Sequence, residues 1–174
     1  MKKPVAAVIV FLLFFTVLIG CSRKEVPPQE IKKYPLDGIE GILTKTNVEF
    51  DPAVSSDGRG SVRIDAPSPV TVRLYEVRNV DAEKATLTYR ARLKTQDLEG
   101  KVFLEMWCVF PGGGEYFSRA LESPVTGTTD WVTQETPFFL KEGHRPEIVK
   151  LNVVVDGKGT VWVDDITLMK GPLR

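Results

Sequence analysis

Residues 101–121 read KVFLEMWCVFPGGGEYFSRAL, and this stretch predicts two β-strands joined by one turn. Between positions 102 and 110 every residue except Glu105 is apolar, and β-branched and aromatic types are frequent. The PGGG segment that follows disfavours a continuing strand or helix, because proline lacks an amide donor and glycine is entropically costly to order. We therefore expect a hairpin at this point of the chain.

Side chains alternate along a strand, and this divides residues 102–109 into two faces. The first face is an apolar set suited to a dry core, namely Val102, Leu104, Met106 and Cys108. The second face carries Phe103, Glu105, Trp107 and Val109. Because an unpaired buried carboxylate is costly, we expect the second face either to be partly wet or to pair Glu105 with a partner.

Short apolar runs broken by turn residues follow one another from residue 36 onward, and no long segment has a helical period. Turns are predicted at 57–60 (DGRG), 67–69 (PSP) and 156–159 (DGKG). The predicted strands are 48–50, 61–65, 70–75, 85–93, 102–110, 116–121, 131–139, 148–155 and 161–169. The fold class is therefore all-β, with a single β-sandwich as the expected architecture.

The alternating segment 85–94, ATLTYRARLK, gives a candidate partner strand for 102–110 across a loop at 95–100. That pairing places Arg90 opposite Glu105, and the hairpin at 111–114 places Ser118 opposite Trp107. One face would then gather five candidate ligand-binding residues, namely Arg90, Glu105, Trp107, Tyr116 and Ser118. The same register sends Arg119 toward the core face, which requires either a bulge or a position near an open end of the sandwich.

The N-terminus has the features of an export signal, with Lys2 and Lys3 followed by an apolar run over 5–19 that is short for a membrane span. The tetrapeptide Leu-Ile-Gly-Cys at 18–21 resembles the bacterial lipoprotein processing site, which implies a lipid on Cys21. The alternative is an ordinary signal that ends near a cysteine. The expected organisation is a signal peptide at 1–20, a lipidated cysteine with a flexible tether at 21–35, and the sandwich at 36–170.

Ser22 follows the cysteine, and by the lipoprotein sorting rules this implies the outer membrane in a two-membrane bacterium and the cell surface otherwise. The chain has 23 basic and 23 acidic residues, and removing Lys2 and Lys3 with the signal leaves 21 basic ones. No long basic run is present, so we expect no nucleic-acid partner.

Two cysteines are present, and Cys108 would be the only free thiol once Cys21 is lipidated. No intramolecular disulfide is then expected. A catalytic thiolate needs a nearby base, and the single histidine, His144, lies in a Gly-His-Arg-Pro segment that nothing ties to Cys108. The sequence therefore does not support a Cys/His catalytic pair.

The segment 159–168, GTVWVDDITL, resembles the closing strand of carbohydrate-binding jelly-roll modules of the CenC type, within the galactose-binding-like superfamily. The segments 57–64 (DGRGSVRI), 89–94 (YRARLK) and 128–131 (TTDW) resemble other strands of these modules in the same order. The resemblance spans roughly 36–170 and implies a jelly-roll sandwich. It also implies a structural calcium at Asp164 or Asp165, whereas the alternative is a strand end with two solvated acids.

The leading functional hypothesis is a non-catalytic carbohydrate-binding module that takes a polysaccharide or a cell-wall glycan and requires no cofactor. A sugar ring would stack on Trp107 or Tyr116, while Arg90, Glu105 and Ser118 bind its hydroxyls. The competing interpretation is that Trp107 only packs and that Arg90 and Glu105 form a structural ion pair.

Two other classes of function compete with this one. An envelope lipoprotein that binds a protein partner would use the same aromatic and arginine side chains. A glycoside hydrolase or lyase would need two carboxylates facing one cleft, yet Glu105 and Glu115 fall on opposite faces in the predicted register. The sequence therefore predicts a binding protein without catalysis.

Overall fold

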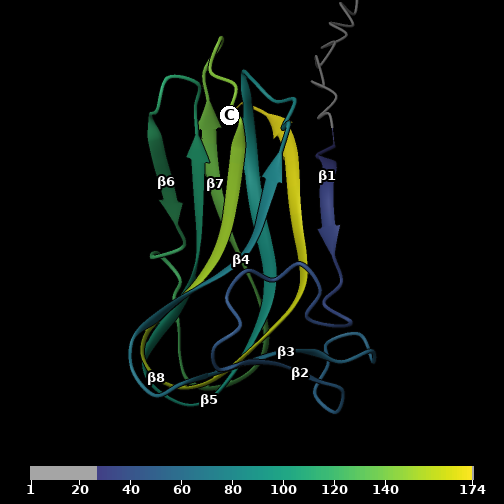
Figure 1. Ribbon diagram of the computed structural model, residues 1–174, viewed down its shortest axis with the longest axis vertical. Coiled ribbons are helices and arrows are strands. Elements are labelled where there is room, and N and C mark those ends of the chain that lie inside the picture. The colour runs from purple at the N-terminus through teal and green to yellow at the C-terminus, as the bar shows by residue number, and fades with distance from the viewer. Residues whose placement is uncertain (1–26, 174) are drawn as a thin grey trace, which may run out of the picture.

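Eight β-strands and no helix make up residues 27–173, which are the residues that the computed structural model describes (Figure 1). The strands are β1 (Gln29–Tyr34), β2 (Val48–Asp51), β3 (Ser61–Ala66), β4 (Val70–Arg78), β5 (Ala85–Val109), β6 (Glu115–Arg119), β7 (Val125–Leu140) and β8 (Ile148–Pro172). The all-β prediction is confirmed. In this part of the chain no helix is present that could span a membrane.

The two longest strands, β5 and β8, organise the fold. They pair antiparallel along their whole lengths, from Val109 opposite Ile148 to Ala85 opposite Pro172. Figure 1 shows both strands curving together at the lower end of the molecule. Each strand thereby contributes one half to each of two layers.

The first layer has the order β6, the second half of β5, the first half of β8, and β4. In the second layer, β7 lies beside the first half of β5, and the second half of β8 lies on the other side. The free edge of β8 then pairs with β3 over one stretch and with β1 over the next, and β2 pairs with β3. The result is a β-sandwich whose two layers are joined by bent strands.

The core lies between the layers, and both halves of β5 supply it. The second half contributes the face predicted from alternation, namely Val102, Leu104, Met106 and Cys108, each of which is fully buried. The first half contributes Leu87, Tyr89, Ala91 and Leu93, which are equally buried. The predicted core face is therefore confirmed.

The Cys108 thiol lies in this core, and burial raises its pKa to about 12. Because the thiolate is the reactive form, we expect Cys108 of the native protein to resist a disulfide reagent at pH 8 and to react once guanidinium unfolds the chain. The release of the coloured thiol product measures this, with Cys108→Ala as the blank. Rapid reaction of the native thiol would contradict the placement.

Two predicted connections, the loop at 95–100 and the turn at 156–159, are wrong. Both segments are bends inside continuous strands, and they pair with each other, with Gly100 opposite Gly157. Positive φ at Gly100 (110°) and Gly157 (157°), together with register shifts between Gln96 and Glu99, lets the ladder bend without ending. Residues typical of turns therefore form bends by which β5 and β8 pass from one layer of the sandwich to the other.

The predicted tether at 21–35 is wrong over its last residues. Residues 29–34 form β1, which pairs with β8 so that Tyr34 lies opposite Ile166. The ring of Tyr34 stacks on Tyr75 with centroids 3.7 Å apart. Exposed lysines are typical of an edge strand, which explains why this segment resembles a tether in sequence. The predicted signal peptide and Cys21 lie outside the described residues.

Candidate functional site

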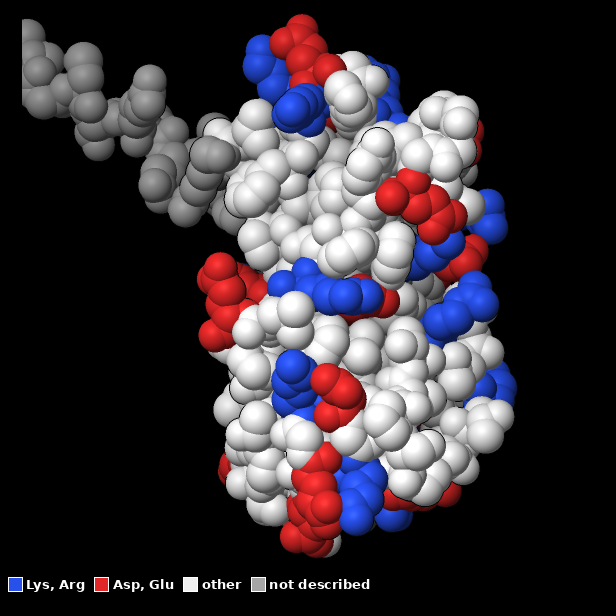
Figure 2. Space-filling model, turned by 90° about the vertical axis from the view of Figure 1, so that its left-hand side faces the viewer, with Lys and Arg blue, Asp and Glu red and all other residues white. Residues whose placement is uncertain are grey.

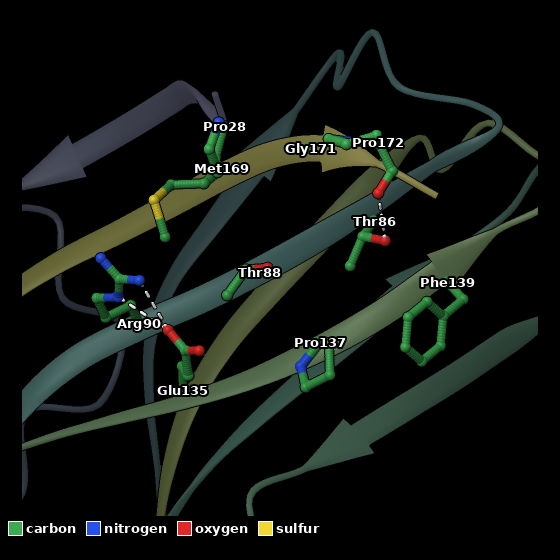
Figure 3. A pocket seen from close by; sticks show the side chains of 10 residues that line it. All are labelled: Pro28, Thr86, Thr88, Arg90, Glu135, Pro137, Phe139, Met169, Gly171 and Pro172. Carbon is green, nitrogen blue, oxygen red and sulfur yellow. Dashed lines mark hydrogen bonds and ion pairs between the residues drawn. The ribbon is translucent and has the colours of Figure 1, made fainter. Parts of the chain in front are cut away.

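A groove of about 400 Å³ lies on the outer surface of the second layer, over β8, β5 and β7 (Figure 3). Its lining comprises Pro28, Thr86, Thr88, Arg90, Glu135, Pro137, Phe139, Met169, Gly171 and Pro172. The volume is within the range of small-molecule sites.

The register of the sheet explains why this surface is hollow. The middle strand, β5, presents Thr86, Thr88 and Arg90 to the outside. Their neighbours on β8 and β7 are Gly171 and Phe139 for Thr86, Met169 and Pro137 for Thr88, and Thr167 and Glu135 for Arg90. Because Thr86, Thr88 and Gly171 are small and lie between the larger Phe139 and Met169, a trough runs along β5.

An ion pair closes one end of the groove. Arg90 directs Nε and Nη2 at one oxygen of Glu135, Oε2, at 2.9 and 2.8 Å (Figure 3). Both side chains are about half exposed. The pair is therefore accessible to a ligand and leaves the groove without net charge.

The other end of the groove is apolar. Phe139 is 56% exposed there, and Thr86 donates a hydrogen bond to the carbonyl oxygen of Pro172 at 3.0 Å. On the side of the molecule shown in Figure 2, uncharged residues cover most of the surface and charges of opposite sign lie beside one another. Such a groove offers hydroxyl, guanidinium and carboxylate groups and an aromatic ring to an uncharged, hydroxyl-rich ligand.

The five side chains predicted to share one ligand-binding face do not lie together. Arg90 lies in the groove of the second layer. Glu105 and Trp107 lie on the outer surface of the first layer, where Trp107 is half-buried. Tyr116 and Ser118 point to the other side of β6, toward β7, and Ser118 Oγ lies 2.6 Å from the Thr136 hydroxyl. The predicted single face is therefore wrong.

The prediction failed because it treated 85–94 and 102–110 as neighbours in one sheet. They are two halves of the same bent strand and belong to different layers. The strands beside the first half are β7 and β8, so Arg90 is paired with Glu135 instead of Glu105. The two segments are close in sequence, but they do not pair with each other in the sheet.

The predicted hairpin register is wrong by one residue. Phe110 and Gly114 close the turn, since the Phe110 amide donates to the Gly114 carbonyl at 2.8 Å. Trp107 then lies opposite Phe117, where Ser118 was predicted, and a shift of one residue exchanges the two faces. The same shift moves Arg119 from the core face to a position opposite Glu105, which removes the need for a bulge.

Glu105 lies on the outer face of the first layer, where neighbouring side chains cover it and leave only 4% of the residue exposed. Arg119 Nε donates to Oε2 at 2.6 Å and Asn152 Nδ2 donates to Oε1 at 3.1 Å. Burial alone would raise the pKa of Glu105, but hydrogen bonds from Trp107, Asn152 and Arg119 outweigh it and hold the pKa below its usual value. The expected partner for Glu105 exists, and it is Arg119 in place of Arg90.

Asp164 and Asp165 were the candidate calcium ligands. Asp164 is fully buried, and its two oxygens accept the amides of Ser56 at 2.9 Å and Asp165 at 2.8 Å. Asp165 instead pairs with Lys33 Nζ at 2.8 Å. Residues 27–173 contain no group of three or more acidic, histidine or cysteine side chains that could hold a metal. A structural calcium at Asp164 or Asp165 stays a prediction, because Ca²⁺ also takes backbone carbonyl oxygens and water as ligands.

Most residues of the groove were not among the predicted site residues, and these include Thr86, Thr88, Glu135, Phe139 and Met169. A usable signal was present, because the outward positions of 85–94 and 131–139 are those that alternate with the buried ones. The groove lining contains a single carboxylate, Glu135, so it lacks the two carboxylates of the usual glycoside hydrolase mechanism.

No protein-family model matches this chain, and no curated protein is a detectable relative. Several solved structures have a fold similar to that of this chain. The xylan-binding CBM22-1 domain of Xyn10C from Paenibacillus barcinonensis has a TM-score of 0.62 at 9% identity, with 84% of this chain and 97% of that one covered. A family 16 carbohydrate-binding module has a TM-score of 0.55 at 12% identity, with 76% and 92% covered.

A third similar structure is TmCBM61 in complex with β-1,4-galactotriose, with a TM-score of 0.51 at 19% identity and with 80% of this chain and 97% of that one covered. At these identities the likeness shows the fold alone. It confirms the jelly-roll β-sandwich of carbohydrate-binding modules as the architecture, while the CenC type stays a prediction.

Proposed function

We propose that this chain is a non-catalytic carbohydrate-binding protein and that the groove over β5 is its binding site. The observation that carries the proposal is an accessible groove of about 400 Å³ without net charge, on a fold shared with carbohydrate-binding modules. The sugar ring would lie against Phe139, and its hydroxyls would bind Thr88, Arg90 and Glu135. Because Arg90 is neutralised by Glu135, the ligand is an uncharged glycan.

We propose further that the protein is exported and anchored by a lipid on Cys21, at the outer membrane of a two-membrane bacterium or otherwise at the cell surface. The support is the sequence at 18–22 alone. Mass spectrometry of the mature N-terminus tests this, since Cys21→Ser is expected to abolish both the lipid and the cleavage before residue 21. An unmodified Cys21 in the mature protein would overturn the anchor.

The binding site is tested by placing a larger side chain in the groove. Thr88→Tyr is expected to weaken binding to xylan or β-1,4-galactan at least tenfold, about 1.4 kcal/mol, because the new ring occupies the groove. The matched control is Thr133→Tyr, an outward residue of β7 that does not line the groove. Affinity electrophoresis against a panel of neutral polysaccharides measures both. Unchanged binding by Thr88→Tyr would exclude this site, and no binding by the unaltered protein would exclude the function.

A second candidate function is the docking of an envelope protein on the outer surface of the first layer. Phe117 is 50% exposed there, its ring packs against Trp107 at 4.9 Å, and the Arg119 guanidinium lies 4.3 Å from the ring centre. Tryptophan and arginine are the residue types that most often anchor protein interfaces. This candidate would be favoured if Phe117→Ala impaired cell-envelope function and left glycan binding intact.

A further inference from the structure

A second cavity, of about 350 Å³, lies at the margin of the sandwich where the two layers meet beside β6 and β7. Aromatic side chains dominate its lining, and two basic ones complete it. They include Phe110, Tyr116, Phe138, Phe139, Lys141 and His144. This composition is that of a binding pocket with an apolar wall and a few polar groups.

One ring holds the others in place. Phe110 follows the end of β5, and its ring centre lies 5.9 Å from Tyr116, 6.3 Å from Phe138 and 6.2 Å from His144. Tyr116 is 62% exposed, so one aromatic surface of this cluster is open to solvent while its edge contact fixes its orientation. An exposed aromatic ring of this kind is suited to stacking against a sugar ring.

The second cavity adjoins the groove at Phe139, which lines both. Phe138 and Phe139 are consecutive residues near the end of β7, so their side chains point to opposite faces and the apolar surface continues around the strand. The groove is closed at its other end by Arg90 and Glu135. A chain-like ligand lying in the groove therefore leaves it past Phe139.

Lys141 and His144 supply the polar groups of the second cavity. Neither forms an ion pair with any residue in the described range 27–173, in contrast to Arg90 in the groove. Both side chains are exposed. His144 Nδ1 lies 3.1 Å from the Glu142 carbonyl oxygen, so the Lys141 ammonium and His144 Nε2 are the groups that remain for the hydroxyls of a ligand.

We propose that the two cavities are successive parts of one extended glycan site, in which the second takes a further sugar residue stacked on Tyr116 and bound by Lys141 and His144. This inference rests on the proposed function. Oligosaccharides long enough to pass Phe139 then bind more tightly than short ones, because only they reach Tyr116.

The test is calorimetry with β-1,4-linked xylose or galactose oligomers, from the disaccharide to the hexasaccharide. The full chain is expected to bind the hexasaccharide at least tenfold more tightly than the disaccharide. Tyr116→Ala is expected to lose that gain and to bind the disaccharide as before. The matched control is Phe117→Ala, which removes a similarly exposed ring that points to the other face of β6.

Thermal unfolding of each variant confirms that it is folded, as the exposure of both rings leads us to expect. Equal affinity of the unaltered chain for all lengths, or an equal effect of Tyr116→Ala at every length, would overturn the extended site and leave the groove intact. No binding of any oligomer by the unaltered chain would overturn the proposed function together with this inference.

Discussion

Replacement of Gly100 by alanine is expected to destabilise the protein by more than about 3 kcal/mol, enough to unfold a domain of ordinary stability. An added Cβ would lie 2.2 Å from the Asp156 carbonyl oxygen and 2.9 Å from the Gly157 Cα. Both obstacles are backbone atoms of the paired bend of β8, so no side chain can move aside. The φ of 110° adds backbone strain for any residue other than glycine.

The matched control is Gly112→Ala in the hairpin turn. Gly112 also has a positive φ, of 87°, but an added Cβ would meet nothing within 4 Å. Its cost is therefore the backbone term alone, about 1 kcal/mol. Guanidinium unfolding followed by tryptophan fluorescence measures both variants. Equal costs at the two glycines would show that β5 and β8 do not cross closely at the bend.

The second large effect is expected from Glu105→Gln, with a loss of about 2 to 3 kcal/mol at neutral pH. The amide cannot accept the charge-assisted hydrogen bonds from Arg119 and Asn152 on both of its polar atoms, and a buried donor is left unpaired. Glu115→Gln is the control on the same surface, since its pair with Lys150 is exposed and is expected to contribute less than about 1 kcal/mol.

The Glu105 effect has a defined pH dependence. The pKa of Glu105 is lowered in the folded protein, so its contribution is complete above the carboxyl's unfolded pKa of about 4.3 and declines as the pH falls through the folded value. The difference in unfolding free energy between the protein and Glu105→Gln should therefore shrink in acid. A difference that stays constant down to pH 2 would contradict the ion pair.

The sequence predicted the strands and the core face well where alternation is strict. Val102, Leu104 and Met106 repeat every second residue, and such a pattern has only one way of facing a core. The same alternation did not predict the bend at 95–100, because the polar residues and glycine of this segment have the composition of a loop. Polar residues are equally suited to the outer side of a bend within a continuous strand. Only the pairing with the partner strand distinguishes such a bend from a loop.

The site was predicted less well, and Arg90 alone was both predicted and found in the groove. Alternation shows which residues face outward, but it does not show which strand lies alongside. Arg90 meets Glu135 through the pairing of β5 with β7, and Thr88 meets Met169 through the pairing of β5 with β8. These contacts join residues far apart in the chain, and a one-residue slip at the PGGG turn was enough to separate Trp107 from Tyr116.

The course of β5 and β8 through both layers also determines how the chain folds. Their first contact in sequence is Val109 with Ile148, and each later pair closes a longer loop until Ala85 reaches Pro172. Contact order is therefore high, and folding is expected on the slow, millisecond-to-second scale of proteins dominated by non-local pairing. A nascent chain on the ribosome that ends before residue 148 lacks a central strand of each layer, so neither layer can be completed until β8 has been synthesised.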